Sequence, residues 1–164
     1  MVWKLPMRRC GTGILLAIAP GVLAVSPRPQ PATAALEAAH GQDGRKTVWS
    51  GVYTEQQAAR GQKAFGRSCG GCHRDDLRGG DEGQPALTGI EFMAEWRDRT
   101  VADLLQLVAQ TMPKTAPGSL GAQTYLEIVA FLLKSNEMPP GATELPTDAD
   151  GLEQIRFAEK PPKR

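Results

Sequence analysis

One short motif, residues 68–73 (SCGGCH), constrains both the fold and the chemistry of this chain. Cys69 and Cys72 stand two residues apart within it, and His73 follows the second cysteine directly. Two thiols at this spacing can add to the two vinyl groups of a haem, and the adjacent imidazole can then reach the iron. The motif therefore predicts one covalently attached haem c, with His73 as an iron ligand.

The same two cysteines have three other interpretations: a redox-active dithiol, half of a zinc site, or a structural disulfide. A thioredoxin-like dithiol belongs near a βαβ pattern, which the sequence lacks, and a zinc site needs a second pair of ligands. The histidine that directly follows Cys72 favours haem over all three.

Residues 1–35 have the three regions of a secretory signal peptide. Basic residues precede an apolar run over residues 11–25, and residues 32–34 (ATA) offer the small-x-small pattern of a cleavage site. The apolar run is short for a membrane-spanning helix and is interrupted by glycine and proline. We expect cleavage near Ala35 and a periplasmic or otherwise exported protein, with an uncleaved membrane anchor as the alternative.

Loss of this leader changes the charge and the cysteine count. The leader carries four of the 19 Lys and Arg residues and none of the 18 acids, which leaves a net charge of −3. Nucleic acid binding is then disfavoured, because its electrostatic footprint is strongly basic. Cys10 would leave with the leader, so thioether formation would use both remaining thiols.

The remaining chain divides into a flexible N-terminal arm at 36–50, a folded domain at 51–157 and a solvated tail at 158–164. Thr54 and Gln57 should form a capping box at the start of the domain's first helix. Thr100 should cap a later helix, which Pro113 stops. No strand pattern appears, and the apolar periodicity predicts helices over residues 54–66, 90–97, 101–112, 123–135 and 148–157.

The residues leave the second axial ligand of the iron open. The other histidine, His40, lies in the arm, and the methionines after the leader are Met93, Met112 and Met138. Met93 falls in a short apolar helix, where methionine is most often core filling, whereas the other two each precede a proline. A thioether opposite imidazole favours Fe(II) and raises the potential, which suits an electron carrier.

From about Gly51 to Phe157 the chain resembles a class I cytochrome c domain, an all-α fold of about four to five helices wrapped around one covalent haem. Gly61 and Phe65 resemble the family's N-terminal helix motif, which crosses the C-terminal helix, here near Ile128. Glycine costs roughly 1 kcal/mol inside a helix relative to alanine, and a close helix crossing would explain its presence. The attachment motif of residues 68–73 also resembles the haem-attachment site of this family.

The resemblance implies further residues that contact the haem. The Pro85 carbonyl would accept a hydrogen bond from the imidazole of His73, and Leu87 completes the family's Pro-x-Leu motif. Trp96 would bond a haem propionate. Met112, which opens a Met-Pro loop, would be the sixth ligand in preference to Met138.

Single-electron transfer is the implied function, without enzymatic turnover, because no paired carboxylates, activated nucleophile or phosphate loop stands out. The donor would be an exported dehydrogenase or similar protein, and the acceptor a terminal oxidase or another cytochrome, through small transient interfaces. The alternatives are a fixed cytochrome subunit of an exported dehydrogenase complex and a gas-binding haem sensor. A membrane partner is expected only if the leader is retained.

Overall fold

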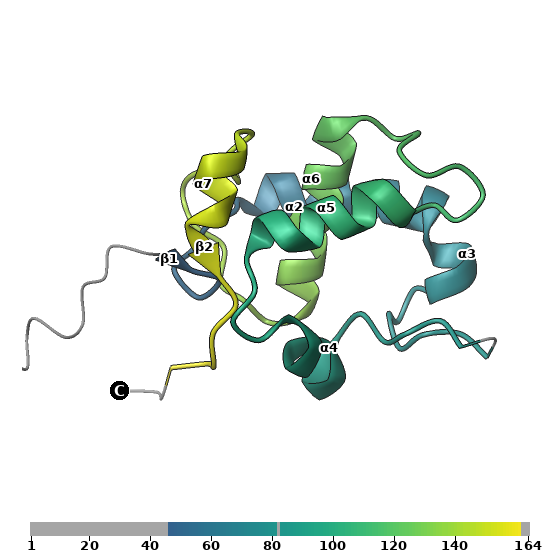
Figure 1. Ribbon diagram of the computed structural model, residues 1–164, viewed down its shortest axis with the longest axis horizontal. Helices are drawn as coiled ribbons and strands as arrows, with labels where there is room; N and C mark the ends of the chain where they lie inside the picture. Colours follow the sequence, from purple (N-terminus) through teal and green to yellow (C-terminus); the bar gives the residue numbers. More distant parts are fainter. Residues whose placement is uncertain (1–45, 82, 162–164) are drawn as a thin grey trace, which may run out of the picture. The chain divides into compact units, whose positions relative to one another are not determined.

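The computed structural model describes residues 46–81 and 83–161 (Figure 1). The predicted leader and the first part of the arm, with Cys10 and His40, lie outside the described residues. Along the chain the elements are β1 (Lys46–Thr47), α2 (Glu55–Ser68), α3 (Gly70–His73), α4 (Gly89–Trp96), α5 (Val101–Thr111), α6 (Ala122–Ser135), α7 (Ala149–Glu153) and β2 (Ile155–Arg156). The predicted all-α class is confirmed. None of these helices combines the length and apolarity needed to cross a membrane.

Hydrogen-bonding side chains fix where the helices begin. The Thr54 hydroxyl accepts from the Gln57 amide at 3.1 Å, as predicted for an N-cap. The reciprocal half of the predicted capping box is wrong, because the buried Gln57 side chain accepts instead from the Leu145 amide at 3.0 Å. A complete capping box stands at α5, between Thr100 and Asp103. Hydrogen bonds from Thr100 hold the pKa of the Asp103 carboxyl below its usual value.

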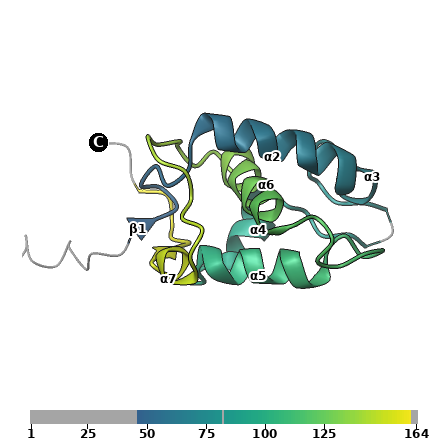
Figure 2. The same ribbon diagram turned by 90° about the horizontal axis from the view of Figure 1, so that it is seen from above.

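Helix α6 crosses and packs against α2 (Figures 1 and 2). A Cβ atom on Gly61 would lie 1.8 Å from the backbone oxygen of Glu127, so only glycine fits here. One turn later the rings of Phe65 and Phe131 meet with centroids 5.4 Å apart. The predicted packing role of Gly61 is thereby confirmed. Glycine lowers the helix propensity of α2, and the contact with α6 that this glycine permits offsets that cost.

Two separate hydrophobic clusters flank α6, which explains why this helix is apolar on more than one side. The larger cluster is built around α4, α5, α7 and the segment that follows β1. The smaller cluster, which we call the α2–α6 cluster, contains Ala64, Phe65, Leu77, Ile128, Phe131 and Leu132. Cys69, Leu87 and Leu120 pack against it and are partly buried.

Both ends of the described region are bonded to the domain, although the sequence predicted a flexible arm and a solvated tail there. Strand β1 pairs in parallel with β2, and Val48 beside it is fully buried, so residues 46–50 belong to the domain and not to a flexible arm. The indole nitrogen of Trp49 donates to the Ala158 carbonyl at 2.7 Å, which fixes the start of the predicted solvated tail. The last helix ends at Glu153 and not at Phe157 as predicted, because the chain then enters β2 and pairs with β1.

The helix crossing predicts opposite effects for two glycines of α2. Gly61→Ala should lower the free energy of unfolding by about 2 kcal/mol or more, because the methyl group meets the α6 backbone. Gly66→Ala is the matched control, since nothing lies within 4 Å of the added Cβ, and it should raise stability by up to about 1 kcal/mol. Urea unfolding of the purified protein measures both. Equal effects at the two positions would contradict the close crossing.

Candidate haem site

The attachment motif forms one tight turn at the end of α2. Cys69 caps α2 through its amide, which donates to the Phe65 carbonyl at 2.8 Å. The amides of Cys72 and His73 then donate to the Cys69 carbonyl at 3.1 and 2.9 Å. Both cysteines are free thiols, Cys69 partly buried and Cys72 exposed, and burial raises the pKa of the Cys69 thiol. Neither cysteine forms a disulfide, and the two lie on one turn, as attachment to both vinyl groups of one haem requires.

The imidazole of His73 lies beside the carbonyl of Pro85. Its side chain is buried, and among the described residues Nδ1 makes no hydrogen bond of ordinary geometry. Burial lowers the pKa of His73; the nearby Pro85 carbonyl opposes that shift, and the positive charge of Lys114 adds to it. The neutral imidazole is the form that binds a metal. An Nδ1–H that points to the Pro85 carbonyl leaves Nε2 for the iron, so the site fits haem ligation.

Residues of the segment after Pro85 are fixed to the far end of α6 by Asn136. Its amide nitrogen donates to the Leu87 carbonyl at 3.0 Å, and its oxygen accepts from the Gly89 amide at 3.0 Å. The amide of Leu87 itself donates to the Leu77 carbonyl at 2.7 Å. Asn136 was not predicted from the sequence, where its one visible signal is an asparagine directly after a predicted helix end.

Leu87 and Trp96 were also expected at the haem, and the structure places only Leu87 beside the attachment motif. Leu87 packs against the same α2–α6 cluster as Cys69. Trp96 lies instead in the larger cluster, where its ring is 5.9 Å from that of Phe157 and the Arg99 guanidinium sits 5.2 Å from its centroid. Its observed contacts are therefore those of a packing residue, and a bond to a propionate stays a prediction.

Apolar side chains that are partly buried border both clusters. Leu87 and Leu120 lie against the α2–α6 cluster, and Leu105 and Val108 of α5 lie against the larger one. The apolar surface that these side chains leave exposed would be removed from water by an apolar group such as a porphyrin, which would stabilise the complex.

Met112 caps the end of α5 and opens the loop at 112–121 that leads to α6. Both views in Figures 1 and 2 show this α5–α6 loop at the same end of the domain as α3. Lys114 of the loop lies close enough to His73 to affect its pKa. The backbone of Met112 is held by the Tyr125 hydroxyl, which donates to its carbonyl at 2.7 Å.

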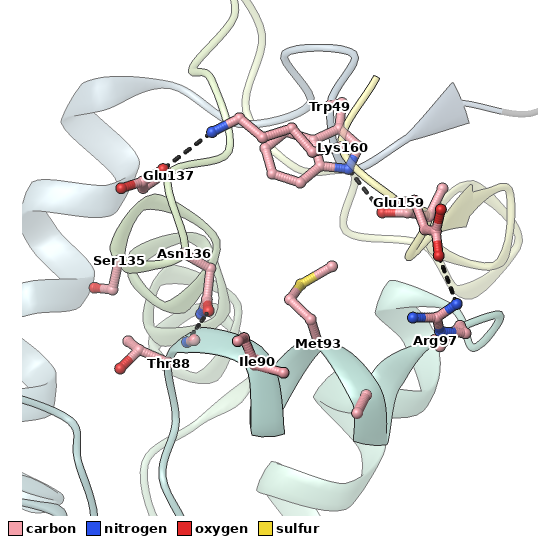
Figure 3. Close-up of a pocket in the computed structure, with 13 residues that line it drawn as sticks. Trp49, Thr88, Ile90, Met93, Arg97, Ser135, Asn136, Glu137, Glu159 and Lys160 are labelled. Atoms are coloured by element: carbon pink, nitrogen blue, oxygen red, sulfur yellow. Dashed lines mark hydrogen bonds and ion pairs between the residues drawn. The ribbon is translucent and has the colours of Figure 1, made fainter. Parts of the chain in front are cut away.

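The other two methionines have different surroundings. Met138 is buried in the larger cluster, and its carbonyl accepts from the Tyr53 hydroxyl at 2.6 Å. Met93 points into a surface cavity of about 600 Å³ beside Trp49 and Ile90 (Figure 3). That cavity is lined by none of the motif residues or Met112, so it is separate from the candidate haem site.

A metal site built from side chains alone finds no support. Within residues 46–81 and 83–161, no group of three or more His, Cys, Asp or Glu side chains could hold a metal ion. The half-zinc interpretation of the two cysteines therefore lacks its second pair of ligands in the described part of the chain.

Comparison with known families agrees with this geometry. Residues 56–132 match the family model described as cytochrome C oxidase, cbb3-type, subunit III. No curated protein and no solved structure matches the chain. The matched region spans α2 to most of α6 and contains the attachment motif, Pro85, Leu87 and Met112. A cytochrome c domain implies a covalent haem c, electron transport and redox partners. The match and the helical fold together support a class I monohaem cytochrome c domain that includes residues 56–132.

Proposed function

We propose that this protein is an exported monohaem c-type cytochrome that carries single electrons from a dehydrogenase or other donor to a downstream acceptor. The observation that carries the proposal is the turn of Cys69, Cys72 and His73, where two cysteines outside any disulfide precede a buried imidazole that lies beside the Pro85 carbonyl. When bound, the haem supplies one-electron Fe(III)/Fe(II) chemistry. The protein residues hold it, orient it and set its potential.

Each residue of the site has a separate task in this proposal. Cys69 and Cys72 hold the porphyrin through thioethers. His73 binds the iron through Nε2 while its Nδ1–H donates to the Pro85 carbonyl, which fixes the tautomer of the ring. Met112 would supply the second iron ligand as a neutral thioether, which would raise the potential. With both positions filled, the iron offers no open site for oxygen, which favours a carrier over a gas sensor or an enzyme.

Export is part of the proposal, because the first 35 residues have the regions of a cleavable leader. The partners would be exported redox proteins: a dehydrogenase as donor, and a terminal oxidase or another cytochrome as acceptor. A second candidate function is a fixed electron relay within a larger complex, such as an exported dehydrogenase. The matched family is described by an oxidase subunit, which favours this second candidate over a sensor.

One measurement of intact mass tests both the proposed haem attachment and the proposed export. Protein matured in its own exported compartment should begin near Ala35 and be heavier than its peptide by one haem, because both thiols are used. Acid-acetone should not extract that haem. A mass with two free thiols would contradict covalent attachment, and recovery of Met1 in the membrane fraction would show a retained anchor.

Two methionine variants test the sixth ligand. Met112→Ala should remove the methionine-to-iron charge-transfer band, lower the potential and open the reduced iron to carbon monoxide, because the thioether is lost. Met138→Ala is the matched control, since Met138 is also followed by proline but lies buried in the larger cluster, and it should leave all three unchanged. Optical and electrochemical titrations measure both variants. The reverse pattern would overturn the assignment of Met112.

The diffusing carrier and the fixed relay differ in their state of association. A transient redox carrier uses a small interface, so the haem absorbance of the exported fraction should elute from gel filtration at the mass of a single chain. Elution in a larger species that survives high salt would instead support the fixed relay. Purified recombinant protein run on the same column is the control for self-association.

A further inference from the structure

The α5–α6 loop has its two ends joined at one buried hydroxyl. The Tyr125 hydroxyl donates to the Met112 carbonyl at 2.7 Å, and the same oxygen accepts from the Leu120 amide at 3.5 Å. Tyr125 is 3 % exposed and belongs to the first turn of α6. The hydroxyl therefore ties the residue that opens the loop and a residue near its end to a rigid helix.

Between these two ends the loop is exposed and locally bonded. Residues 114–119 are all exposed. The Ala116 amide donates to the Pro113 carbonyl at 2.9 Å and the Ser119 amide to the Ala116 carbonyl at 3.3 Å, which are turns within the loop. Such bonds shape the loop but do not hold it against the domain. The contact with Tyr125 does, because α6 is packed against both α2 and α5.

We propose that Tyr125 is the positioning residue for the sixth ligand: its hydroxyl fixes the backbone of Met112 so that the methionine sulfur stays on the iron. This inference rests on the proposed ligation by Met112. A neutral thioether is a weak iron ligand, so its bound fraction depends on how firmly the chain presents it. Removal of the hydroxyl leaves the Met112 carbonyl and the Leu120 amide without their partner, and the loop then opens more often.

The chain contains a matched control for this interaction. The Tyr53 hydroxyl donates to the Met138 carbonyl at 2.6 Å, and Tyr53 is fully buried. Each tyrosine therefore bonds the carbonyl of a methionine that precedes a proline, but only Tyr125 bonds the methionine proposed to bind the iron. Tyr125→Phe and Tyr53→Phe remove the same atom and lose a bond of the same type.

The test uses matured holoprotein and measures two properties of the iron. Tyr125→Phe should increase the rate of carbon monoxide binding by the reduced protein about tenfold or more, because the ligand-free fraction rises. The oxidised protein should also lose its methionine charge-transfer band at a lower alkaline pH. Tyr53→Phe should leave both properties within about twofold of the parent protein, although it too weakens resistance to urea.

Three outcomes separate this proposal from the one on which it rests. Equal changes in the two phenylalanine variants, or none in Tyr125→Phe, would overturn the role of Tyr125 while Met112→Ala still removes the band. A parent protein without the band, unaltered by Met112→Ala, would overturn both proposals. If Tyr125→Phe matures poorly, hydrogen exchange at the Leu120 amide in the remaining holoprotein provides the second measurement, and unchanged protection there would contradict the contact.

Discussion

The close crossing of α2 and α6 is the contact on which the rest of the domain depends. Gly61 allows the α2 backbone to touch that of α6 at Glu127. Because α2 ends at the attachment turn, the crossing also sets where Cys69 and the turn after it lie relative to α6. A shift of this contact would move the thiols and His73 together, as one rigid piece.

Helix α6 then fixes a loop at each of its ends. Tyr125 bonds the loop that begins at Met112, and Asn136 bonds the segment at Leu87 and Gly89. Eleven residues separate these two polar side chains, which is close to three helical turns, so they share one side of the helix about 16 Å apart. The loop at Met112 and the segment at Leu87 and Gly89 are thus held by one helix, and their separation is set by its length.

Local features of the sequence predicted most of the fold, whereas contacts between distant residues could not be predicted. The attachment turn, the Thr54 and Thr100 caps and the reason for Gly61 follow from spacing, from residue type or from the family resemblance. The partner of Gln57 lies 88 residues away at Leu145, and the two-residue strands are too short to show a period. Tyr125 falls within the predicted helix at 123–135, but the partner of its hydroxyl depends on which loop folds over it.

The central claim is that one covalent haem lies between His73 and Met112 at this end of the domain. The proton NMR spectrum of the reduced holoprotein tests it most directly, since a methionine bound to haem iron has its methyl signal shifted strongly upfield by the ring current. We expect one such methyl signal, with contacts to the α5–α6 loop. A spectrum without it, or one whose shifted methyl belongs to Met138 or Met93, would contradict the account.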